Sequence, residues 1–160
     1  MSTTAVVDMQ IASDARDLPD EEQLRSWVVS TLLAADANAD RKVELSVRLV
    51  DEDESRDLNN RYRKKDKATN VLSFPFEDLD GLPGEIDRPL GDLVICAPVV
   101  AQEASEQNKV LRDHWAHMVI HGTLHLLGYD HQIDAQAQTM EALEIDILRG
   151  FGIENPYRET

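Results

Sequence analysis

The stretch from residue 111 to 127 constrains the fold more than any other part of the chain. At the helical spacing of 100° per residue, one stripe is apolar, and further apolar residues extend it around the back (Leu111, Trp115, Met118, Val119, Gly122 and Leu126; Ile120, Leu124 and Leu127). A helix that is apolar nearly all round is buried, so the other elements must pack around it. The remaining stripe carries four histidines, His114, His117, His121 and His125. One such histidine is usually a core residue, but four need polar partners in an apolar setting.

The spacing of these histidines predicts a metal site. His121 and His125 are one turn apart, about 6 Å along the axis, so two imidazoles can converge on one ion. Adding His117 would extend the set to about 12 Å, which is too far for three bonds of roughly 2.1 Å. Gly128 can end the helix in a left-handed conformation and let the chain return His131 to the ion. We therefore predict one zinc per chain, held by His121, His125 and His131 at the end of the buried helix.

The fourth position of this predicted site is open, as in catalytic zinc centres that lower the pKa of a bound water to about 7. The stretch "HGTLHLLGYDH" also matches the metzincin zinc-protease pattern H-E-x-x-H-x-x-G-x-x-H at all positions but one. That position holds the general-base glutamate in the proteases and Gly122 here. The ligand pattern is therefore present without the base for peptide hydrolysis.

The charge distribution leaves two interpretations open. The chain has a formal net charge of −15, yet six of its 16 Lys and Arg residues fall within "RDLNNRYRKKDK" (Arg56, Arg61, Arg63, Lys64, Lys65 and Lys67). Screening limits electrostatic effects to about 8 Å at physiological salt, so this basic cluster could bind phosphate beside an acidic surface. The alternative is a solvated helix end.

The other patterns predict an α+β fold in one domain spanning residues 1–160. Strands are expected at 6–12, 43–50, 70–76 and 92–98, and Pro75 places the third at a sheet edge. The fourth is a continuous apolar run, typical of a central strand. Helices are expected over 24–35, 53–63, 98–107, 109–127 and 134–149, with Gly150 as the last C-cap and a long loop over 77–91.

Several features favour a cytoplasmic protein. The single cysteine, Cys96, excludes an internal disulfide and suits a reducing compartment. The start "MSTTAVVDMQ" lacks the pattern of a signal peptide. No apolar run approaches the roughly 20 residues that span a membrane, so we expect no membrane partner.

The chain resembles the YbeY family of bacterial zinc-dependent endoribonucleases. The resemblance rests on "HGTLHLLGYDH", "HWAHMVIHG", "YRKKDKATNVLSFPFE" (62–77) and "LGDLVIC" (90–96), and covers most of the chain from about residue 43. It implies a small mixed sheet, here of four strands, packed by about five or six helices. It also implies zinc on His121, His125 and His131, and a role for Arg63 in nuclease activity. The implied function is cleavage of single-stranded RNA in 16S rRNA 3′-end maturation and ribosome quality control.

The expected mechanism has zinc polarising a phosphate oxygen, activating a water, or both, while Arg63 stabilises charge on phosphorus. The general base stays open among His114, Asp92 and zinc-bound hydroxide, of which we favour the last. Expected partners are single-stranded RNA, ribosomal RNA and ribosomal subunits, with ribosomal proteins as a further class. Two rival functions are a metalloprotease and a non-catalytic, metal-containing ribosome assembly factor.

Overall fold

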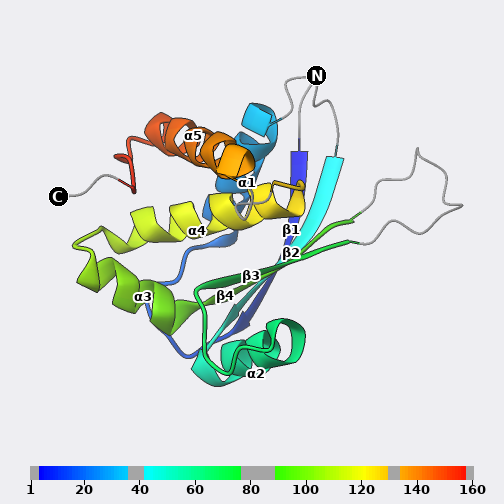
Figure 1. Ribbon diagram of the computed structural model, residues 1–160, viewed down its shortest axis with the longest axis vertical. Coiled ribbons are helices and arrows are strands. Elements are labelled where there is room, and N and C mark those ends of the chain that lie inside the picture. Colours follow the sequence, from blue (N-terminus) through cyan, green and yellow to red (C-terminus); the bar gives the residue numbers. More distant parts are fainter. Residues whose placement is uncertain (1–3, 36–41, 77–88, 130–133, 158–160) are drawn as a thin grey trace, which may run out of the picture.

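The computed structural model describes residues 4–35, 42–76, 89–129 and 134–157, and its elements confirm the α+β expectation. In these ranges the chain forms four strands and five helices (Figure 1). Their order is β1 (Thr4–Ala12), α1 (Glu21–Ala35), β2 (Lys42–Val50), α2 (Glu52–Arg63), β3 (Val71–Pro75), β4 (Pro89–Cys96), α3 (Ala97–Glu106), α4 (Leu111–Leu126) and α5 (Asp134–Gly150).

The four strands form one mixed sheet in the order β1-β2-β4-β3. β1 and β4 both run parallel to β2, and β3 is antiparallel to β4. The predictions of an edge strand containing Pro75 and of a central apolar strand are both confirmed. The predicted loop over 77–91 was too long at its end, because β4 already begins at Pro89, where it pairs with Glu44 of β2. The remaining loop residues, 77–88, lie outside the described ranges.

The two faces of the sheet are covered differently. Helices α1, α4 and α5 lie on one face, and α2 packs against the opposite face (Figure 1). On the first face, alternate β2 residues Val43, Leu45, Val47 and Leu49 join the main core. Trp115, Ile120 and Leu124 of α4 are at most 2% exposed, so the prediction of a buried helix is confirmed.

The end of α5 corrects the prediction that Gly150 is its C-cap. The residue with the left-handed conformation is Gly152 (φ +77°), two positions later. Its amide donates to the Arg149 carbonyl (3.0 Å), and the Ile153 amide donates to the Leu148 carbonyl (3.0 Å), as in a Schellman motif. The Phe151 amide also donates to the Leu148 carbonyl (2.9 Å). This tighter turn continues past Gly150, and the chain reverses only at Gly152.

Within the described ranges, no helix combines the length and the apolar character that crossing a membrane would require.

Candidate metal centre

The four histidines of α4 form a continuous row, as their spacing predicts. Successive ring centroids are separated by 6.1 Å, 6.1 Å and 4.7 Å from His114 to His125. The first two rings, His114 and His117, are buried, and the last two are half-buried. The row therefore runs from the protein interior to a surface groove.

The last two rings have the geometry expected of two ligands to one ion. The Nε2 atoms of His121 and His125 lie 3.1 Å apart. Two nitrogens at 2.1 Å from a tetrahedral ion would be separated by about 3.4 Å. Imidazole is a preferred zinc ligand, so the donor set and its spacing both fit that metal.

Gly128 ends α4 as the sequence predicts. It has φ +103°, in the region that favours glycine, and donates its amide to the His125 carbonyl (3.0 Å). The Tyr129 amide donates to the Leu124 carbonyl (3.1 Å), which completes a Schellman motif. The chain therefore leaves the helix axis immediately after His125. His131, the third predicted ligand, lies outside the described residues.

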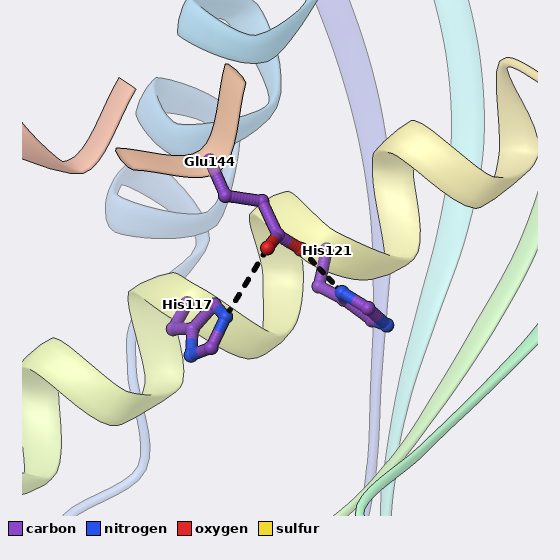
Figure 2. A group of neighbouring side chains, drawn as sticks. All are labelled: His117, His121 and Glu144. Atoms are coloured by element: carbon purple, nitrogen blue, oxygen red, sulfur yellow. Dashed lines mark hydrogen bonds and ion pairs between the residues drawn. The ribbon is translucent and has the colours of Figure 1, made fainter. Parts of the chain in front are cut away.

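Glu144 of α5 is the most important partner of the histidine row. Its fully buried carboxylate lies between His117 and His121 (Figure 2). One oxygen, Oε1, accepts a hydrogen bond from Nδ1 of His121, and the Tyr157 hydroxyl donates to the other, Oε2. Nε2 of His117 is 3.6 Å from Oε2. The carboxylate thus joins two turns of α4 to α5 and to the C-terminal segment.

The carboxyl of Glu144 is held in its charged form despite its burial. Burial by itself would raise the pKa of this carboxyl, but the adjacent imidazoles of His117 and His121 lower the pKa to about 2. The same environment acts oppositely on Tyr157, where burial and the adjacent carboxylate raise the pKa of the hydroxyl. Tyr157 therefore remains a hydrogen-bond donor to Glu144.

The hydrogen bond between His121 and Glu144 assigns the two nitrogens of the His121 ring to different partners. A carboxylate can only accept, so Nδ1 of His121 carries the proton and Nε2 presents its lone pair toward His125. In Figure 2 the far end of the His121 ring points away from Glu144. Metal-binding histidines commonly donate their other N–H to a carboxylate, which fixes the ring orientation and raises its basicity.

A second set of possible ligands overlaps the first. His117, His121 and Glu144 offer ligand atoms within 4.8 Å of one another, so this group could also hold a metal ion. It would use Nδ1 of His121 and a carboxylate already engaged by the Tyr157 hydroxyl. The Nε2 pair instead faces a groove that a substrate can reach. We therefore favour Glu144 as the orienting partner of a ligand.

Sequence reasoning missed both Glu144 and Tyr157. A signal for the first was present, because Glu144 lies four residues from both Met140 and Leu148, two members of the apolar stripe of α5. A carboxylate at a core position of an amphipathic helix is rare unless it is paired. No comparable pattern marks Tyr157, which follows the last helix.

The structure places Arg63 in the groove that holds the two histidines. This groove of about 600 Å³ is lined by Tyr62, Arg63, residues 69–75, His121 and His125. Arg63 is the last residue of α2 and is exposed. Two segments that lie about sixty residues apart in sequence, the basic cluster and the histidine helix, therefore form one site.

The described ion pairs divide the basic cluster into two groups. Arg56 pairs with Asp66 (2.7 Å) and Arg61 pairs with Asp57 (3.1 Å). Among the described residues, Arg63 and the three lysines that follow it in the cluster form no such pair. The available positive charge is thus concentrated at the end of α2 that borders the groove.

Two buried side chains of α2 fix this basic loop. Ser55 both donates to the Thr69 carbonyl and accepts from the Thr69 amide, each at 3.0 Å. One turn later, the Asn59 side chain donates to the Lys67 carbonyl (2.9 Å). Lys64 adopts the left-handed conformation (φ +58°) that turns the chain from helix into loop. Arg63 is therefore attached to a segment with defined geometry.

Gly122 packs against the sheet. A Cβ atom at this position would lie 2.8 Å from Cδ2 of Leu93 and 3.3 Å from Cγ2 of Val71. A side chain there would therefore point into β3 and β4, where a carboxylate would be buried without room. Gly122, at the position that supplies the base in the proteases, is thus a site of close packing between α4 and the sheet.

The two side chains considered as general bases lie elsewhere. His114 is hydrogen-bonded to Glu103 (2.9 Å) and lines a separate cavity of about 640 Å³. Asp92 accepts a hydrogen bond from Ser46 (2.5 Å) on the face of the sheet that α2 partly covers. Neither residue lines the groove of Arg63, His121 and His125.

Comparison with known proteins points to one family. The sequence profile described as endoribonuclease YbeY matches residues 8–152. A curated protein from Colwellia psychrerythraea (strain 34H), named "Endoribonuclease YbeY", is 51% identical over 154 residues, covering 96% of this chain and 97% of that protein. The solution structure of TM1509 from Thermotoga maritima is similar in fold, with a TM-score of 0.55 and 23% identity, covering 94% of this chain and 99% of that one.

Proposed function

Because the chain belongs to the YbeY family of endoribonucleases, we propose that it is a zinc-dependent hydrolase that cleaves single-stranded RNA. Its proposed biological role is 16S rRNA 3′-end maturation and ribosome quality control in the cytoplasm. Ribosomal RNA and ribosomal subunits are the proposed partners. Ribosomal proteins are a further class of partner, which the acidic surface would contact. Each chain is proposed to act as one domain with one zinc ion.

The observation that carries this proposal is the shared groove of Arg63, His121 and His125. The two imidazoles supply ligands for a divalent cation, and the guanidinium beside them, which has no ion-pair partner among the described residues, matches a phosphate. Both groups can stabilise the negative charge that develops on the phosphoryl oxygens during RNA cleavage.

The proposed ligands are His121, His125 and His131, with Glu144 holding the His121 ring through its Nδ1–H. When bound, the zinc would supply a Lewis acid and lower the pKa of a water in the groove. Arg63 would bind the scissile phosphate through two N–H groups and stabilise its added charge. Lys64, Lys65 and Lys67 would bind flanking phosphates and attract the RNA.

Arg63→Ala tests this assignment directly. The variant should keep its zinc and its fold, since Arg63 is exposed and lies outside the metal set. Its cleavage rate at saturating RNA should fall by about 100-fold, as when one charge-stabilising donor is removed elsewhere. Arg63→Lys should restore binding more than cleavage, because ammonium lacks the bidentate fork.

The matched control is Lys65→Ala, which should weaken RNA binding modestly and reduce its salt dependence without a large change in rate. All variants should be compared with the wild type and with His121→Ala on an RNA that carries a duplex and single-stranded ends. Wild-type protein that holds zinc, binds ribosomes and leaves RNA intact would identify a non-catalytic assembly factor. Equal rates for Arg63→Ala and the wild type would remove Arg63 from the catalytic groups.

A further inference from the structure

Tyr62 is a large aromatic residue that stays 61% exposed beside the candidate site. It precedes Arg63 at the end of α2 and lines the same groove as His121 and His125. Tyr62 also lines a second hollow of about 600 Å³, which lies between α2 and the sheet. Tyr62 therefore belongs to a ridge, shared with Phe74 and Pro75, that separates the two depressions.

The orientation of Tyr62 is fixed by the edge strand. The Phe74 ring contacts it at a centroid distance of 5.1 Å and an interplanar angle of 66°, an edge-to-face arrangement. Such pairs stabilise a defined ring geometry. Phe74 belongs to β3 and is paired with Asp92 of β4, so the support is part of the sheet. The ring is thus exposed and also held in place.

The charges on the two sides of the ridge differ. On the groove side, Arg63 is available and the lysines of the basic loop follow it. In the hollow on the other side, Arg48 is bound by Glu54 through two hydrogen bonds (2.5 and 3.0 Å), and Asp92 adds a negative charge. An RNA backbone would therefore run on the groove side, with the Tyr62 ring beside it.

We propose that Tyr62 is the stacking platform for one base of a single-stranded RNA whose phosphate is bound by Arg63, an inference that rests on the proposed nuclease function. Aromatic side chains stack on every base, so this contact tolerates any sequence. A base in a duplex is already stacked and paired and cannot turn onto the ring. Tyr62 would then select single strands, and Phe74 would act as its positioning residue.

The test compares Tyr62→Leu and Tyr62→Phe in the zinc-loaded protein. For single-stranded RNA, Tyr62→Leu should raise KM by about 10-fold, the effect of losing one base–aromatic stack, with a smaller change in kcat. Activity on a duplex of the same sequence should change little, so the preference for single strands should fall by a similar factor. Tyr62→Phe should retain wild-type KM and preference, because it keeps the aromatic face.

Phe76→Leu is the matched control, since Phe76 is an aromatic residue directly after β3 that is 44% exposed but does not line the groove. It should leave KM within about twofold, because no base stack is lost. A Tyr62→Trp variant gives a direct signal: its fluorescence should be quenched by single-stranded RNA and not by inorganic polyphosphate. The native tryptophans, Trp27 and Trp115, are at most 4% exposed and provide a constant background.

Unchanged KM and strand preference in Tyr62→Leu, or equal quenching of Tyr62→Trp by polyphosphate, would overturn the inference while leaving the nuclease function intact. Wild-type protein that cleaves no RNA would remove both. The readouts therefore separate the failure of the stacking platform from the failure of the proposed function.

Discussion

The two halves of the histidine row use the same residue type for different purposes. In the first half, His114 is buried against Glu103 and His117 lies between Tyr157 and Glu144. In the second half, His121 and His125 direct their Nε2 atoms toward each other at the groove. All four residues occupy one stripe of one helix. Their roles differ because of the groups that other elements bring to them.

The comparison shows how the surroundings of the two structural histidines differ from those of the two proposed ligands. Each structural histidine has Nε2 beside a carboxylate or a hydroxyl, while its Nδ1 is buried and has no hydrogen-bond partner among the described residues. A ligand keeps one nitrogen directed at the site, while a buried carboxylate takes the other nitrogen. Glu144 acts at the boundary between the two, since it contacts His117 on one side and His121 on the other.

The largest effect should come from removing a ligand. His125→Ala should lower zinc affinity by more than the 10- to 100-fold that loss of an outer partner typically costs, and RNA cleavage should fall with it. His114→Gln should retain one zinc per chain. Metal analysis after dialysis checks both variants. Equal zinc content in His125→Ala and His114→Gln would contradict the different roles proposed for the two halves of the row.

A smaller loss is expected from Glu144→Gln. The substituted amide keeps the size of the side chain but removes the charge that orients His121, so zinc affinity should fall by about 10- to 100-fold. The protein should remain folded, with the Tyr157 hydroxyl still able to donate to the amide oxygen. Competition with a chromogenic chelator measures the affinity. Complete loss of zinc would instead favour Glu144 as a direct ligand.

Gly128→Val tests the chain reversal that follows the second half of the row. Since a β-branched residue resists a positive φ, the variant should lose about 1–2 kcal/mol of unfolding free energy. Zinc affinity should also fall, because the proposed return of His131 depends on this turn. Chemical unfolding and metal titration check the two effects. Gly150→Val, at an exposed glycine without a positive φ, is the matched control.

The smallest effect concerns His114 and should appear only in stability. Burial lowers the pKa of this imidazole below 6.5, although the bond to Glu103 acts in the opposite direction. The His114 imidazole therefore binds a proton more readily in the unfolded chain than in the folded protein. Stability decreases as the pH falls through about 6.5. His114→Gln should reduce this slope while costing about 1 kcal/mol at neutral pH. Urea unfolding between about pH 7.5 and 5.5 measures it; an unchanged slope would assign the titration elsewhere.

Features that depend on residues close together in the chain could be predicted from the sequence. Pro75 indicates an edge strand, the apolar surface of α4 indicates burial, and Gly128 marks the end of that helix. The approach of His121 and His125 follows from their spacing on a helix. Each of these depends on residues within a few positions of one another.

The remaining features depend on tertiary packing. Glu144 meets His121 only because α5 crosses α4, and Tyr157 completes the contact from the C-terminal segment. Arg63 and residues 69–75 line one groove because Ser55 and Asn59 of α2 hold the backbone of Thr69 and Lys67. Helical periodicity cannot show which histidine of the row is hydrogen-bonded to a carboxylate from another element. That information lies in the relative placement of distant elements.

The absence of a side chain at position 122 also has a consequence for protein engineering and for evolution. Introducing the protease glutamate here would take a single amino-acid substitution, and the ligand spacing would already be correct. Yet the first carbon of any new side chain would overlap Leu93, and repacking an interior in this way typically costs about 1–3 kcal/mol. A path from this scaffold to peptide hydrolysis would therefore also require the Leu93 side chain to shift, so the two chemistries are separated by a packing cost as well as by the missing base.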